Sequence, residues 1–144
     1  MATTMPGEVD LDKLLASLDP VLDAREFAYA SVPHGTVLPA GLQPLGLFHE
    51  DEGLTLIAPA TELAAAGIPA LAGLARLTMM VQSSLEAVGM TAAMAAALTR
   101  SGISANVVAA YHHDHIFVPW ERRNEAMAVL RALADQGSAG GMTS

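Results

Sequence analysis

The sequence predicts an α+β fold with antiparallel sheets, and three observations support this class. The second half has the order strand, helix, strand, strand, helix, and two pairs of neighbouring strand patterns are joined by short polar turns. The chain has 144 residues, of which 52% are apolar, so it can bury a proper core. These numbers allow one compact domain or two small subdomains that pack together.

The first half predicts a helix, a strand, a hairpin and a second helix. Four leucines at helical spacing end before Pro20, and a loop rich in proline and glycine follows the first strand. An acidic turn ends at Gly53, and Pro59 suits the first turn of a helix. The expected elements are a helix over residues 11–18, a strand over 26–32, a hairpin over 45–49 and 54–58, and a helix from 59 to 67.

The second half supplies five of the six elements of a ferredoxin-like βαββαβ unit. The expected elements are a strand over residues 75–82, a helix over 90–101, strands over 103–111 and 115–118, and a helix over 121–135. A closing strand is missing, because residues 136–144 are rich in glycine and serine and predict a disordered tail. The first half lacks an opening strand. We therefore expect two units, residues 10–70 and 71–135, that share strands in an interleaved sheet.

The charge and the composition exclude several classes of partner and chemistry. A net charge of −8 with seven Lys and Arg leaves no basic stripe, which argues against nucleic acid and anionic membranes as partners. The absence of cysteine excludes disulfides and thiolate metal sites. Residues 1–10 have no signal-peptide pattern, and the apolar runs are too short to span a membrane. A cytoplasmic protein that binds a neutral or zwitterionic small molecule is expected.

The strand-to-helix connection over residues 82–91 is the first candidate binding segment. Free backbone N–H groups and the positive end of a helix dipole favour a carboxylate there, and serine hydroxyls add donors. The alternative is that a serine only caps a turn and Gly89 only meets a backbone requirement. The candidate ligand-binding residues of this segment are Ser83, Ser84, Leu85, Val88, Gly89 and Met90.

Two further segments are candidates for the walls of a ligand site. Asn106, Val107 and Val108 lie in an expected edge strand, whose backbone groups could hold the amino and carboxylate groups of a ligand. Alternatively, the Asn106 amide faces solvent or satisfies the backbone at a bulge. Phe48, His49 and Glu50, on the first hairpin, are candidates for the facing wall.

The cluster from His112 to His115 contains good zinc or nickel ligands, but consecutive side chains of a tight hairpin point to opposite faces. A solvated or hydrogen-bonded turn is therefore expected, with no metal and no cofactor. Ser84, His113 and Glu86 supply the residue types of a serine–histidine–acid triad, yet none lies in a nucleophile elbow. We expect no enzymatic activity.

The run from Ser83 to Pro119 resembles the C-terminal ACT domain of a small bacterial family of tandem ACT-domain proteins. The first half is similar to the companion domain, and together the two similarities cover about residues 10–134. The motifs of the resemblance are Ser83–Leu85, Val88–Met90, Gly102–Ser104, Asn106–Val108, the Tyr111–Asp114 turn and Phe117–Pro119, with Val32–Pro33, Phe48 and Gly53–Leu56 in the first half.

This family is similar to the regulatory domains of aspartokinases and to eukaryotic arginine sensors, in which amino acids bind between ACT units. The resemblance implies a regulatory sensor module that holds a free amino acid or similar metabolite at an ACT–ACT interface. An incomplete sheet with an exposed edge also predicts a homodimer. The alternative is a structural protein–protein interaction module that uses exposed sheet edges.

Overall fold

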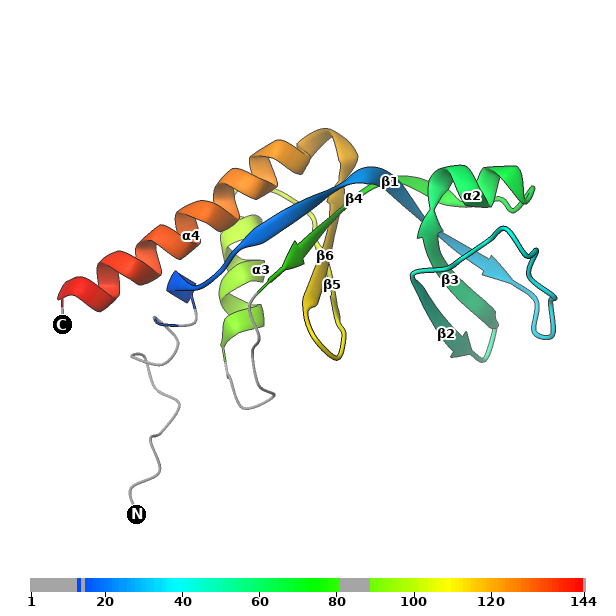
Figure 1. Cartoon of the computed structure of the whole chain (residues 1–144), viewed down its shortest axis with the longest axis horizontal. Helices are drawn as coiled ribbons and strands as arrows, with labels where there is room; N and C mark the ends of the chain where they lie inside the picture. Colours follow the sequence, from blue (N-terminus) through cyan, green and yellow to red (C-terminus); the bar gives the residue numbers. More distant parts are fainter. Residues whose placement is uncertain (1–12, 14, 81–88, 144) are drawn as a thin grey trace, which may run out of the picture. The chain divides into compact units, whose positions relative to one another are not determined.

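The computed structural model describes residue 13, residues 15–80 and residues 89–143, and this part of the chain forms two compact units (Figure 1). One unit is Asp23–Arg76, and the other contains the described residues before Asp23 and after Arg76. The strands are β1 (Pro20–Val32), β2 (Gly46–Glu50), β3 (Gly53–Pro59), β4 (Leu71–Met79), β5 (Asn106–Ala109) and β6 (Asp114–Pro119). The helices are α2 (Ala60–Ala65), α3 (Met90–Arg100), the short 3-10 helix η1 (Trp120–Arg122) and α4 (Arg123–Thr143).

The strands have the order β2-β3-β1-β4-β6-β5. The division between the units falls within β1 and within β4, so each of these strands contributes residues to both units. The sequence-based prediction of two ferredoxin-like units that share strands is therefore confirmed. The start of β1 supplies the strand that the second half lacks, and the start of β4 supplies the fourth strand of the Asp23–Arg76 unit.

Both shared strands are longer than the sequence predicted. The patterns suggested strands from residues 26 and 75, whereas β1 begins at Pro20 and β4 begins at Leu71. Proline is acceptable as the first residue of a strand, since its missing N–H then costs no ladder hydrogen bond. The extra length is stabilised by long-range contacts between β1 and β4, including a 2.9 Å hydrogen bond from the backbone N–H of Gly73 to the Glu26 carboxylate.

In the Asp23–Arg76 unit, strand alternation separates a covered sheet face from an open one. The core cluster on the covered face contains Ala28, Ala30 and Val32 from β1, Leu56 and Ala58 from β3, Leu63 from α2, and Leu42 from the loop before β2. The β1–β3 register pairs Ala30 with Leu56 and Ser31 with Thr55. Because successive residues of a strand point to opposite faces, Ser31 and Thr55 project away from α2.

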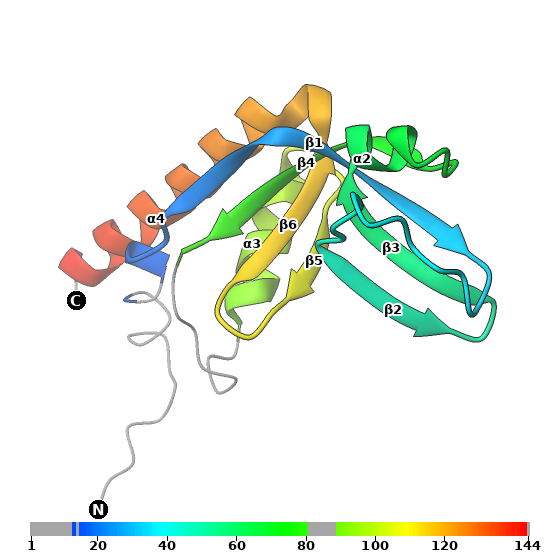
Figure 2. The ribbon, with the colours of Figure 1, turned by 45° about the vertical axis from the view of Figure 1, so that its right-hand side comes forward.

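In the other unit, α3 and α4 lie side by side against one face of the sheet (Figure 2). The helix predicted over residues 90–101 is confirmed as α3, and it buries Met90, Met94, Ala97 and Leu98. The Arg122 guanidinium donates hydrogen bonds of 3.0 Å to the carbonyls of Ser101 and Gly102, which satisfies backbone groups at the end of α3. The first predicted helix is seen in part, since Leu15 and Ala16 are helical.

Two other boundaries in this unit differ from the sequence-based prediction. Strand β5 covers Asn106–Ala109 rather than residues 103–111. Helix α4 continues to Thr143, through residues that the sequence predicted as a disordered tail. Glycine costs about 1 kcal/mol per residue in a helix, but adding residues to an existing helix avoids the cost of nucleation. No helix in the described part of the chain is long and apolar enough to cross a membrane.

Candidate functional site

The open face of the Asp23–Arg76 unit carries a pocket of about 620 Å³. Its floor is a row of directly paired residues across three strands, in which Ser31 pairs with Thr55 and Thr55 pairs with Phe48. Residues directly opposite each other on neighbouring strands project to the same face and lie close together. We call this site the open-face pocket, and its lining residues are Tyr29, Ala30, Ser31, Phe48, Glu50, Thr55, Pro69, Ala70 and Leu71.

The β2–β3 hairpin fixes the position of Glu50 at this pocket. Glu50 pairs with Gly53 across a turn made by Asp51 and Glu52. Gly53 has φ +158°, and a Cβ atom at this position would lie 2.7 Å from the carbonyl oxygen of Val32. Only glycine therefore allows β3 to approach the end of β1 this closely, and this approach places the Glu50 side of the hairpin next to Ser31.

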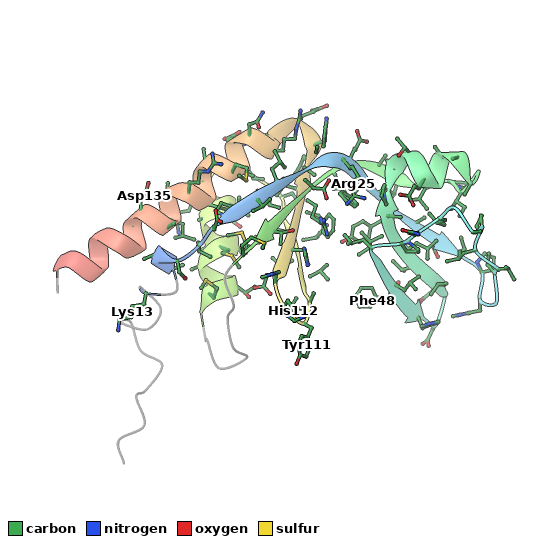
Figure 3. The ribbon with its side chains drawn as sticks, viewed as in Figure 1. Lys13, Arg25, Phe48, Tyr111, His112 and Asp135 are labelled. Atoms are coloured by element: carbon green, nitrogen blue, oxygen red, sulfur yellow. The ribbon has the colours of Figure 1, made fainter. Side chains whose placement is uncertain are left out.

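The lining of the open-face pocket combines one carboxylate, three hydroxyl groups and an apolar surface. The Thr55 hydroxyl donates a hydrogen bond to Glu50 Oε1, which orients the carboxylate. Burial raises the pKa of the Tyr29 hydroxyl, so this group stays neutral at physiological pH. Phe48, which projects from β2 in Figure 3, is 52% exposed, and Leu71 is 78% exposed. The pocket thus offers an apolar surface and a polar edge with one negative charge.

A second polar cluster of the same unit lies on β1 and β4. The Asp23 carboxylate accepts hydrogen bonds from Arg25 Nε at 3.0 Å and Nη2 at 2.9 Å, and from Arg76 Nη2 at 2.8 Å. The hydrogen bonds from Arg25, followed by that from Arg76, hold the pKa of Asp23 well below its usual range. Both guanidinium groups also lie near the Phe27 ring, at 5.1 and 5.2 Å from its centroid. This cluster joins the two shared strands and is structural.

Of the binding residues predicted from the sequence, Phe48 and Glu50 lie together in the open-face pocket. His49, between them on β2, pairs with Leu54 and points to the opposite face. Sequence reasoning missed Tyr29, Ser31 and Leu71, because these residues meet Phe48 only through long-range strand pairing. Thr55 could have been found from the hairpin turn alone, since a two-residue turn at Asp51 and Glu52 fixes its pairing with Phe48.

The remaining predicted binding residues belong to the other unit or fall outside the described residues. Ser83, Ser84, Leu85 and Val88 lie outside the residues that the structure describes. Gly89 caps α3 with φ 98°. Met90 is only 2% exposed, so its side chain belongs to the core and only its backbone could meet a ligand. Asn106, Val107 and Val108 form β5 with Ala109, at the end of the strand order opposite to β2.

The histidine turn places its side chains in different environments. His115 Nδ1 lies 3.0 Å from the Thr78 hydroxyl, on the neighbouring strand. The His112 ring packs edge-on against Tyr111, and the two labelled side chains lie at the tip of the β5–β6 turn in Figure 3. Within residues 13, 15–80 and 89–143, no three His, Asp or Glu side chains gather as a metal ion would require.

Two family models match the sequence in tandem. Both describe an ACT domain, and they cover residues 6–74 and 75–132. None of the curated proteins has a sequence that matches this one.

Several solved structures are similar to this chain. A Vibrio cholerae protein of unknown function, described as a possible transport protein, is 37% identical, with a TM-score of 0.79 over 89% of this chain and 99% of that chain. The ligand-free regulatory subunit of aspartate kinase from Thermus thermophilus is 11% identical, with a TM-score of 0.57 over 79% of this chain and 95% of that one. An Agrobacterium tumefaciens protein is 14% identical, with a TM-score of 0.68 over 81% and 89% of the respective chains.

Proposed function

Because the chain belongs to the ACT-domain family, with two ACT domains in tandem, we propose that it is a regulatory module that binds a free amino acid. The observation that carries this proposal is the open-face pocket, where the sequence-predicted residues Phe48 and Glu50 lie side by side with three hydroxyl groups. A volume of about 620 Å³ falls within the usual range for small-molecule sites, about 300 to 1,000 Å³. ACT domains are regulatory rather than catalytic modules, and regulatory subunits of aspartate kinase share this fold.

The proposed ligand uses both parts of the lining. Its apolar side chain packs on Phe48 and Leu71, and its polar groups meet the hydroxyls and the Glu50 carboxylate. Phe48 is about half exposed without a ligand, so covering the ring contributes favourable free energy at roughly 25 cal/mol per Å² of apolar surface. Regulation follows if the ligand binds one arrangement of the protein more tightly than another and so shifts the population.

The expected result of a thermal-shift screen against the twenty amino acids is a selective rise in melting temperature with a few of them. Calorimetry with the best ligand should show about tenfold weaker binding for Phe48→Ala, because truncating the ring removes apolar contact area at the pocket. Leu47→Ala is the matched control, since Leu47 is the preceding residue of β2, is similarly exposed at 48%, and points to the other face.

Two outcomes would count against amino-acid binding at this pocket. A flat screen at millimolar ligand would remove the proposed function and favour the alternative of a partner-binding module. Equal losses for Phe48→Ala and Leu47→Ala would mean that the ligand does not occupy the open face.

We further propose that the protein is a homodimer and that the second chain completes the ligand site. Strands β2 and β5 end the strand order, and an edge strand presents backbone groups that pair readily with another chain. Phe48 and Glu50 both lie on the β2 edge strand, so a second copy placed along β2 would close the pocket beside them. Sedimentation equilibrium at micromolar concentration should give twice the chain mass of 14.9 kDa, with tighter association when ligand is present. A ligand-independent monomer would contradict this arrangement.

A further inference from the structure

We propose that the open-face pocket recognises its ligand through a primary ammonium group bound by Glu50, so that the ligand class is a primary amine with an apolar side chain. This inference rests on the proposed function and narrows it. It assigns Glu50 to the ligand's ammonium group and Phe48 with Leu71 to its side chain. A free carboxylate on the ligand is not required.

The first argument for an ammonium ligand is the charge of the residues that line the pocket. Among the described residues that line the pocket, Glu50 is the only one with a carboxylate side chain, and no Lys, Arg or His lines the pocket with it. A ligand carboxylate would therefore lie near a negative charge without a cationic partner. The whole chain has a net charge of −8, which adds long-range repulsion of anions. Both effects favour cationic ligands and disfavour acidic ones.

The orientation of Glu50 carries the second step. The Thr55 hydroxyl donates to Oε1, which fixes the carboxylate on the face shared with Phe48 and Ser31. A carboxylate accepts about four hydrogen bonds, so this contact leaves acceptor positions open, and an ammonium group has three donors to fill them. The Ser31 and Tyr29 hydroxyls, which also line the pocket, are further acceptors within the same lining. Hydrogen bonds between charged groups are shorter and stronger than neutral ones.

The apolar surface carries the third step. An exposed ion pair alone strengthens binding by about fivefold at most, so the charge cannot by itself provide useful affinity. Phe48, Leu71, Pro69 and Ala70 line the same pocket and supply the surface on which an aliphatic or aromatic side chain can be buried. The affinity then comes mainly from the side chain, while Glu50 selects for the amine.

A matched ligand series tests this division of roles by calorimetry on the full chain. The probes are leucine, leucinamide, isoamylamine, N-acetylleucine and glutamate, with phenylalanine, phenylalaninamide, phenethylamine and N-acetylphenylalanine as the aromatic set. Leucinamide or phenylalaninamide, and the corresponding free amine, should bind at least as tightly as the parent amino acid. Acetylation should weaken binding at least tenfold, and glutamate should give no heat.

The Glu50→Gln variant keeps the shape of the side chain and removes its charge. We expect it to bind the amines about fivefold more weakly, whereas the matched Glu52→Gln variant, which removes the same charge from the adjacent turn outside the pocket, should bind them like the parent protein. Amine binding that is unaffected by Glu50→Gln, or N-acetylleucine that binds as well as leucine, would overturn the inference. If Glu50→Gln had no effect but Phe48→Ala still weakened binding, amino-acid binding at the open-face pocket would stand and only the role of Glu50 would be rejected. No binding by any probe would remove both.

Discussion

Replacing Leu63 with alanine should lower the free energy of unfolding by about 3 kcal/mol, within the range of about 2 to 5 kcal/mol for buried leucines. Leu63 is fully buried and is the only α2 residue in the core cluster of the Asp23–Arg76 unit. The other six members of that cluster come from β1, β3 and the loop before β2, and three of them are alanines. The remaining side chains are therefore too small to fill the cavity that the substitution leaves.

Urea denaturation followed by circular dichroism measures this loss. Leu71→Ala is the control, because Leu71 is 78% exposed and its truncation should change the free energy of unfolding by less than about 0.5 kcal/mol. The two variants should also separate stability from binding, since Leu71 lines the open-face pocket and Leu63 does not. A Leu63→Ala protein as stable as the parent would mean that α2 is not held on the sheet through this side chain.

Replacing Asp23 with asparagine should lower the free energy of unfolding at pH 7 by about 2 kcal/mol. The substitution removes the charge that faces two guanidinium groups. The Arg76 side chain is only 16% exposed, and its Nε is already buried without a hydrogen-bond partner, so it has little access to water as compensation. The Arg25 side chain is 55% exposed and contributes less, because solvent screens its charge.

The pH dependence gives this prediction a second readout. The pKa of Asp23 is lowered from its ordinary value of 3.8, so its contribution is fully present above that value and is lost as the pH falls towards the folded-state pKa. The difference between the parent and Asp23→Asn should therefore be smaller at pH 3 than at pH 7, as measured by urea denaturation. Asp51→Asn, in the exposed β2–β3 turn, is the control and should cost little at either pH. An Asp23→Asn loss that is the same at both pH values would show that charge is not its cause.

The sequence predicted those parts of the fold that depend on local patterns. Residues 90–100 and the hairpin around Asp51 and Glu52 carry their own periodicity and turn chemistry, so both elements were found. The start of β1 was missed because Asp23 and Arg25, which come shortly before Glu26, put charges in a strand, and local patterns disfavour this. Those charges are compensated by Arg76 and by the Gly73 backbone, about fifty residues away in the sequence. Such long-range compensation has no local signature.

The residues of the candidate site also separate into those that local sequence patterns predicted and those that they missed. Phe48 and Glu50 could be proposed from the sequence because they lie on the strand that leads directly into a recognisable turn. Tyr29 and Leu71 belong to the same pocket only because β1 pairs with both β3 and β4, and that register depends on tertiary packing. The loop over residues 82–91 remains a sequence-based prediction, since most of it lies outside the described residues.

Because β1 and β4 are shared, the chain cannot be cut cleanly into its two ACT domains. The two family matches meet between residues 74 and 75, which suggests a natural point at which to separate the domains. A chain cut there would lose Arg76, the partner of Asp23, from its first part, and its second part would lack the start of β1. Neither fragment would be a self-contained piece for expression or for gene fusion. We therefore expect the tandem pair, rather than a single domain, to be the smallest part of this protein that folds on its own.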